Sequence, residues 1–182
     1  DDLEAHTFTD CVGLCRGRCQ TRANIVNAIL KDAVAFGCRV QNVICSPNDD
    51  GNSPALQAIM RRSHIALKVI LDAGAPVDVG NTKSGWSNIM HAITKRDLHA
   101  INLLLARGAN ANHIAKPHGL TPLIVAVANS HEIACLRLLD AGADAQMAED
   151  FIRDMYGDCR HVQTMLDMLV YVAKKHSRSC PT

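Results

Sequence analysis

The chain has 182 residues, of which 48% are hydrophobic and 20% are charged, and its net charge is +1. These values are typical of one soluble domain or one stack of repeats. The balanced charge gives no broad attraction to nucleic acid or to an acidic membrane, and no apolar run approaches the roughly 18 residues of a membrane span. Aromatic residues make up only 3%, which favours a core of Ala, Leu, Ile and Val.

The first fifty residues are predicted to form an N-terminal cap unit. A helix is expected over residues 24–35, because Ile25, Ile29 and Ala33 recur at helical spacing. Gly37 is a suitable residue to end this helix. Residues 46–51 contain the Pro, Asn, Asp and Gly that are typical of a turn.

Residues 51–146 contain one sequence unit three times, with a period of 34 residues. Each copy starts with a segment that suits a helix N-terminus and runs on to a Gly-Ala pair that suits a helix end. The starting segments are Ser53-Pro54-Ala55-Leu56-Gln57-Ala58, Ser87-Asn88-Ile89-Met90-His91-Ala92 and Thr121-Pro122-Leu123-Ile124-Val125-Ala126, and the pairs are Gly74-Ala75, Gly108-Ala109 and Gly142-Ala143. A repeat of this length indicates a stacked repeat protein.

Each copy predicts two helices, which in the first copy run from Ser53 to Arg61 and from His64 to Ala73. One unit cannot bury its apolar face alone, whereas three stacked units form a continuous core. Residues 77–86 and 111–120 are expected to project as exposed, hairpin-like loops. The residues expected to face the core are Ala58, Ile59, Leu67, Ile70, Leu71, Ala92, Ile93, Ile101, Leu104, Leu105, Ala126, Val127, Cys135, Leu138 and Leu139.

Residues 149–156 and 161–174 predict a final helix pair, and Asp158 is suited to cap its second helix. This unit lacks the proline and the closing Gly-Ala pair, as expected of a terminal cap. The residues expected to face the stack are Phe151, Ile152 and Met155 in the first helix and Val162, Met165, Leu166, Leu169 and Val172 in the second.

The three copies resemble the ankyrin repeat, whose pattern is Gly-x-Thr-Pro-Leu-His-x-Ala, a second helix rich in Val and Leu, and then Gly-Ala-Asp. The best copy joins Gly119-Leu120-Thr121-Pro122-Leu123 to Leu138-Leu139-Asp140-Ala141-Gly142-Ala143-Asp144. The family's His is replaced by Leu56, Met90 and Ile124, so apolar packing should replace the Thr–His hydrogen bonds of the family. Asn88 also stands where Pro is usual.

The resemblance implies an all-α ankyrin-repeat solenoid of helix-turn-helix units with hairpin fingers and helical caps. We interpret residues 1–182 as a single domain that is a monomer when alone. Its parts are an N-terminal cap unit at 1–50, repeats at 51–84, 85–118 and 119–148, and a C-terminal cap unit at 149–182.

The resemblance also implies that a partner protein binds the loop tips and the concave face of the first helices. Trp86 is the leading candidate, because exposed Trp is enriched at binding hot spots. Its alternative role is local packing against the adjacent loop, and the alternative for each other candidate is a solvated surface residue. Together the candidates form a basic, His-rich face that suits an acidic partner. They are Lys83 and Trp86 in the first loop, His113, Lys116, Pro117, His118 and Leu120 in the second, and Arg61, His91, Lys95, Gln57, Val125 and Asn129 on the first helices.

The eight cysteines lie mostly outside the three repeats. The ends of a stack have one neighbour instead of two, and disulfides there would stabilise most, by about 2–4 kcal/mol each. This distribution favours disulfides and an oxidising compartment. The alternative is that several cysteines are small buried apolar residues. The disulfide candidates are Cys11, Cys15, Cys19, Cys38, Cys45, Cys159 and Cys180.

No catalytic residue, metal site or cofactor is predicted, since the chain has no glycine-rich phosphate loop, paired metal-ligand motif or nucleophile elbow. Cys11, Cys15 and Cys19 with His6 leave zinc as an alternative, although structural zinc sites more often use closer cysteine pairs. Cys135 occupies a predicted core position, which does not suit a nucleophile.

The leading hypothesis is a non-catalytic protein that binds and inhibits a partner enzyme in an oxidising compartment, as an immunity protein does. The protein would be periplasmic or secreted, and its partner would be a periplasmic or secreted hydrolase. The chain starts at Asp1 without Met, which fits signal-peptide removal or a trimmed sequence. The alternative is a cytoplasmic ankyrin adaptor, or a viral or effector mimic of ankyrin inhibitors that retain transcription factors. A metal-dependent enzyme is the third hypothesis.

Overall fold

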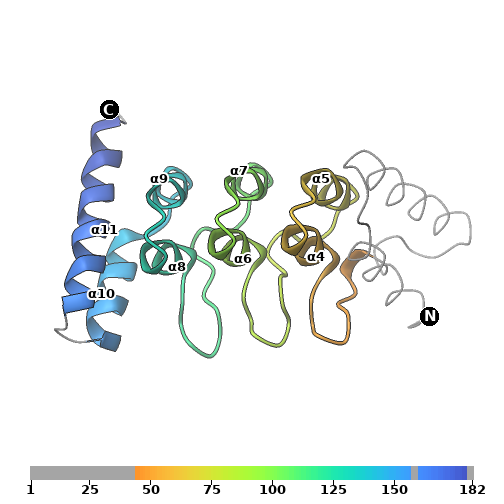
Figure 1. Ribbon diagram of the computed structural model, residues 1–182, viewed down its shortest axis with the longest axis horizontal. Helices are drawn as coiled ribbons and strands as arrows, with labels where there is room; N and C mark the ends of the chain where they lie inside the picture. Colours follow the sequence, from red (N-terminus) through yellow and green to blue (C-terminus); the bar gives the residue numbers. More distant parts are fainter. Residues whose placement is uncertain (1–43, 157–159, 180–182) are drawn as a thin grey trace, which may run out of the picture.

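The computed structural model describes residues 44–156 and 160–179. In this part of the chain three helix pairs stand side by side in a row, and a fourth pair closes the C-terminal end (Figure 1). The all-α solenoid expected from the sequence is therefore confirmed. The pairs are α4 (Pro54–Met60) with α5 (His64–Asp72), α6 (Asn88–Thr94) with α7 (Leu98–Ala106), α8 (Pro122–Ala128) with α9 (Glu132–Asp140), and α10 (Ala145–Tyr156) with α11 (Arg160–Ser179).

The helices form two layers, and the loops between repeats project from one side of the stack (Figure 1). The first helices α4, α6 and α8 pack on one another, and so do the second helices α5, α7 and α9. Isolated antiparallel bridges pair Asn52 with Asn81 and Ala115 with Leu120. The first bridge joins two successive loops, and the second closes the loop at 111–120. In the loop at 77–86 the Asn81 N–H donates to the Trp86 carbonyl at 3.0 Å. Both predicted loops therefore have the hairpin-like form that was expected of them.

The first helices start at small hydroxyl residues, as the repeated segments predict. Ser53 Oγ accepts a hydrogen bond of 3.1 Å from the Leu56 N–H, and Thr121 Oγ1 accepts one of 3.4 Å from the Ile124 N–H. In the middle repeat Ser87 makes no such bond. There Asn88, which stands where proline is usual, is fully buried and donates from Nδ2 to the Val77 carbonyl at 2.9 Å.

Both helices of each repeat end in the same hydrogen-bonded turn, in which one residue has a left-handed backbone. After α4, the Arg62 N–H donates to the Ile59 carbonyl and the Ser63 N–H to the Ala58 carbonyl, each at 2.9 Å, which is the Schellman pattern. The left-handed residue is Gly74, Gly108 or Gly142 after the second helices, with φ of 94°, 78° and 83°. After the first helices it is Arg62, Arg96 or Ser130, with φ of 52°, 52° and 48°.

A continuous apolar core runs through the stack. The side chains that replace the family's His, at Leu56, Met90 and Ile124, are at most 1% exposed, so apolar packing occupies this position in every repeat. Of the predicted core residues, Leu105 and Leu139 are half-buried and pack against the core, and the other repeat positions are buried.

The C-terminal pair differs from the prediction at its boundaries. Helix α10 begins at Ala145 rather than at 149, because Asp144 Oδ1 accepts from the N–H groups of Gln146 and Met147 at 2.9 and 3.1 Å. The predicted boundary between residues 148 and 149 therefore falls inside a helix. Met155 was expected to face the stack, but it is 61% exposed. Helix α11 is longer than predicted and ends at Ser179, and Met165, Leu166, Leu169 and Val172 are buried as expected.

Most of the predicted N-terminal cap unit, Asp158 and the side chain of Val162 lie outside the described residues, as do six of the seven disulfide candidates. The seventh, Cys45, is half-buried and carries a free thiol where a disulfide was expected. Burial raises its pKa above the ordinary value. Ile44, next to it, is 1% exposed and belongs to the core of the stack.

Substitutions at the two kinds of left-handed turn, those with glycine and those without, are expected to change stability in opposite directions. Ser130→Gly should raise the free energy of unfolding by about 1 kcal/mol, because glycine has no Cβ to oppose a positive φ. Gly142→Ala should lower it by about 1 kcal/mol. An added Cβ at Gly142 meets nothing within 4 Å, so this cost is conformational. Urea unfolding measures both effects.

Ser130→Ala is the matched control, since it keeps a Cβ in the left-handed conformation and should leave stability nearly unchanged. Shifts of the same sign in the Ser130→Gly and Gly142→Ala variants would contradict the assignment.

Candidate binding surfaces

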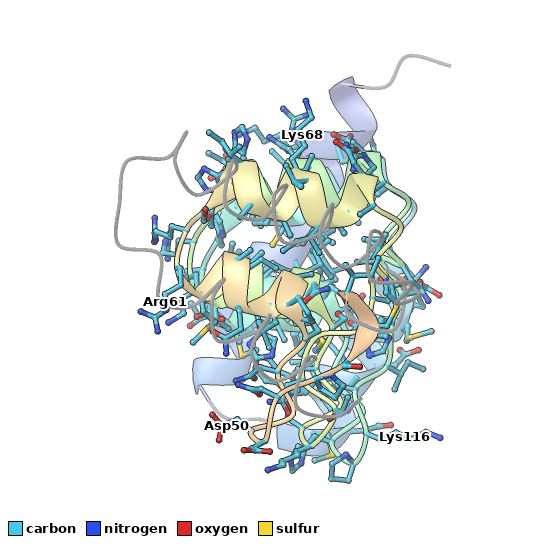
Figure 2. All side chains as sticks on the ribbon, turned by 90° about the vertical axis from the view of Figure 1, so that its right-hand side faces the viewer. Asp50, Arg61, Lys68 and Lys116 are labelled. Carbon is cyan, nitrogen blue, oxygen red and sulfur yellow. The ribbon has the colours of Figure 1, made fainter. Side chains whose placement is uncertain are left out.

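The candidate binding residues lie on two separate parts of the stack. Figure 2 looks along the row of repeats and shows Arg61 at the turn after α4, with Lys116 on a loop at the opposite side. The predicted single basic, His-rich face is therefore wrong. One group lies at the turns between the two helices of a repeat, and the other lies on the loops between repeats.

The first group is the turn ridge, which we define as Arg61, Arg62, Lys95 and Arg96. All four side chains are exposed. Arg61 and Lys95 occupy the C-cap positions of α4 and α6, and an arginine follows each of them in the left-handed conformation. Arg61 and Lys95 were predicted from the sequence, whereas Arg62 and Arg96 were not. The signal that could have found them is a basic doublet that recurs after 34 residues.

Two arginines of the turn ridge, Arg62 and Arg96, also connect successive repeats. The Arg62 guanidinium donates to the Lys95 carbonyl at 2.5 Å, and the Arg96 guanidinium donates to the Asn129 carbonyl at 2.9 Å. On the second helices, Arg107 and Asp72 form an ion pair of 2.7 Å between neighbouring repeats. These contacts recur at nearly one repeat length, so they hold the repeats in register.

Asp97 is the buried carboxylate beneath the turn ridge. It accepts from the Ala100 N–H at 3.1 Å, which caps α7, and it contacts His64 Nε2 at 2.8 and 2.9 Å. Burial acts to raise the Asp97 pKa. The hydrogen bonds from Ala100 and His64, together with the charges of His64 and Arg62, outweigh burial and hold that pKa below its ordinary value.

Trp86, the leading candidate, is half-buried and is therefore not a fully exposed loop residue. Its side chain packs against the apolar core, and its ring lies 5.5 Å from the His91 ring between centroids. Burial first, and then the charge of Lys95, lowers the His91 pKa to about 4. His91 is therefore uncharged near neutral pH and adds no positive charge to this surface.

The second group is the loop tips, which we define as Lys83, Lys116, Pro117 and His118. All four residues are exposed. The Lys83 ammonium donates to the Asp49 carbonyl and so links two successive loops.

Several other candidates have structural contacts that reduce their availability to a partner. His113 is half-buried and its Nε2 lies 3.0 Å from the Gly85 carbonyl oxygen. Leu120 is half-buried against the core, and Val125 is only 4% exposed. Gln57 and Asn129 are half-buried, and Asn129 Nδ2 donates to the Val125 carbonyl at 2.8 Å. The expectation that Leu120 and Val125 are exposed was wrong.

Two features of the described residues bear on catalysis, the Cys135 thiol and the grouping of possible metal ligands. Cys135 is fully buried, and burial is the main cause that raises its pKa to about 12, so its thiol does not suit a nucleophile. No group of three or more His, Cys, Asp or Glu side chains within residues 44–156 and 160–179 is placed to hold a metal ion. The zinc alternative at His6, Cys11, Cys15 and Cys19 lies outside this part. No helix in the described ranges is long and apolar enough to cross a bilayer.

Comparison with known proteins identifies related sequences over the repeats. A family model described as ankyrin repeats in three copies matches residues 56–149. The B-cell lymphoma 3 protein homolog of Mus musculus is 36% identical over 69 residues, which cover 32% of this chain and 15% of the mouse protein. The chain thus matches only a small part of that relative.

The low pKa of His91 predicts that the protein is less stable in acid. The free energy of unfolding should fall as the pH decreases from 6.5 to about 4, because the unfolded chain binds a proton there that folded His91 does not. His91→Gln should remove about 1–2 kcal/mol of this fall, after allowance for the partly exposed ring. Urea unfolding at several pH values measures the slope.

Some slope should remain in the variant, because burial and then the charge of Arg96 also lower the His131 pKa. The matched control is His118→Gln on an exposed loop tip. A His91→Gln variant that keeps the whole slope would contradict the prediction.

Proposed function

The chain belongs to the ankyrin repeat family, and we propose from this premise that it is a non-catalytic module that docks on one partner protein. Ankyrin repeats indicate a protein-interaction module. The observation that carries the proposal is that the stack displays exposed side chains that its own packing does not need. The side chains of Arg61 and Lys95 are exposed, and in the described part of the chain no hydrogen bond or ion pair involves them. The loop tips add Pro117 and His118 on hairpin-like turns.

The stack is suited to present these residues in fixed positions. Neighbouring repeats are joined by side-chain contacts at the turn ridge, between second helices and between loops. A surface that is ordered before binding loses less conformational entropy when a partner docks. The extended surface fits the surface of another protein better than it fits a small molecule, which would require a concave pocket.

We further propose that docking masks a partner enzyme in an oxidising compartment, the partner being a periplasmic or secreted hydrolase. The concentration of cysteines outside the repeats supports this proposal. The second candidate function is a cytoplasmic adaptor, or a viral or effector mimic of ankyrin inhibitors. It is favoured by the free thiols of Cys45 and Cys135. The state of the six other cysteines separates the two.

Photocrosslinking tests whether the module docks on a partner protein. Benzoylphenylalanine at Lys95 in the turn ridge or at His118 in the loop tips should yield one predominant adduct in cells that express the protein. The same group at Lys68 should not, because Lys68 points outward from α5, away from both surfaces (Figure 2). Equal adducts from all three positions, or none from any, would contradict the docking proposal.

Counting thiols tests the compartment. If the six remaining cysteines form three disulfides, protein purified from its native source and denatured without reductant should contain two reactive thiols, those of Cys45 and Cys135. A thiol reagent with an absorbance readout measures the number, and protein reduced before the assay is the control. Eight free thiols would instead support the cytoplasmic adaptor.

A further inference from the structure

The turn ridge is a continuous row of positive charge. It places two basic residues in each of two adjacent repeats at equivalent positions, since each pair follows the first helix of its repeat. The hydrogen bond from the Arg62 guanidinium to the Lys95 carbonyl brings the charge of one repeat against the turn of the next. In the third repeat the equivalent residues are Asn129 and Ser130, so the row ends there.

No exposed carboxylate neutralises this row from the same turns. Asp97 is the only acidic residue within them. It is 4% exposed, and its oxygens are already bound by His64 and the Ala100 N–H. The charges of the ridge also act on their surroundings, because Lys95 contributes to the lowered pKa of His91 and Arg96 to that of His131.

The ridge keeps donors available after its structural bonds are made. Arg62 and Arg96 each donate to one backbone carbonyl, whereas a guanidinium has five N–H donors. Arg61 points outward from its turn in Figure 2. Arg62 and Arg96 also have a positive φ. At the equivalent position after the second helix, the same repeats have a glycine. Side chains kept at a conformational cost are more often found at functional surfaces.

We propose that the turn ridge binds an acidic, extended segment of the partner protein, with carboxylates that pair with the basic residues of the two repeats. This proposal rests on the proposed function, since it names the chemistry of the partner. Planar guanidinium groups pair well with carboxylates through two parallel hydrogen bonds. A protein segment fits better than nucleic acid, because the net charge of the chain is only +1 and the positive row is confined to two turns.

The distance between neighbouring repeats also favours one backbone conformation for the bound segment. Packed helices such as α4 and α6 lie about 8–10 Å apart. A polyproline II segment rises about 3.1 Å per residue with three residues per turn, so acidic residues at every third position lie on one face about 9 Å apart. A segment of this kind presents one carboxylate to each repeat.

A designed peptide tests this inference. A fluorescein-labelled peptide with four repeats of Glu-Pro-Pro should bind the full chain in a fluorescence polarisation assay. The affinity should fall as salt is raised, because the charges of an exposed ridge are screened. The same peptide with Gln in place of Glu should bind at least about tenfold more weakly. Equal binding of the Glu and Gln peptides, or no binding of the Glu peptide at low salt, would overturn the proposal.

Charge reversal locates the site. The double variant Arg61→Glu/Lys95→Glu should lower the affinity for the Glu peptide at least about tenfold. The matched control is Lys68→Glu/Lys174→Glu, which changes the net charge equally at exposed residues on α5 and α11 and should change affinity less than about twofold. Arg61→Gln/Lys95→Gln serves as a milder variant if the reversal unfolds the chain, which circular dichroism would detect. An equal loss in the variant and its control would contradict a site at the turn ridge.

Two further probes separate an acidic protein segment from other polyanions. A twelve-residue oligothymidylate and vesicles that contain phosphatidylserine should each bind more weakly than the Glu peptide at equal charge concentration. Tighter binding of either probe, lost in Arg61→Glu/Lys95→Glu, would overturn the assignment to a protein segment. If His118 crosslinks to a partner but the Glu peptide does not bind, only the inference about the turn ridge is contradicted. If no position crosslinks, the docking proposal itself is contradicted.

Discussion

The structure depends on one constraint, which is that a single helix pair cannot bury its own apolar face. The alanines at equivalent positions of the first helices, Ala58, Ala92 and Ala126, have no exposed surface, because each lies between neighbouring helices of the stack. Burial therefore comes from the contact between repeats rather than from any one repeat. The same constraint requires a different unit at the end, where α10 and α11 cover α8 and α9. The loops add to this core, since Ala111 and Ala115 are buried in it and Trp86 packs against it. The loop tips and the side chains of the turn ridge remain exposed.

This constraint explains why most of the fold could be predicted from the sequence. The buried residues recur with a period of 34 residues. Ser53 and Thr121 are recognisable N-cap residues, and they mark the starts of α4 and α8. The end of the first helix near Arg61 was predicted, but the left-handed conformation of Arg62 and Arg96 was not, because the usual glycine of such a turn is absent there. The early start of α10 was missed for a different reason. Asp144 had been assigned to the repeat pattern, although its carboxylate also caps the next helix.

The binding surface was less predictable, because exposure depends on contacts between loops about thirty residues apart. His113 lies in a polar loop and would be expected to be exposed, yet its Nε2 contacts the Gly85 carbonyl of the preceding loop. Trp86 likewise packs against the core and His91. The spacing of residues along the chain predicts which helix face a residue occupies. It does not predict which loop residues are buried by the neighbouring loop. Charged residues at helix ends are easier to place, as Arg61 and Lys95 show, because their position follows from the helix boundary.

Two arginines of the turn ridge, Arg62 and Arg96, combine a structural role with a contribution to the surface charge. Arg62 and Arg96 stabilise the register of the repeats through bonds to backbone carbonyls, and they contribute charge to the exposed edge. Changing either one would alter stability, backbone strain and surface charge together, so a loss of binding would not identify its cause. Arg61 and Lys95 occupy helix C-caps with ordinary negative φ, and within the described ranges their side chains take part in no hydrogen bond or ion pair. Substitution at these two positions changes the charge of the edge while the stacking contacts remain.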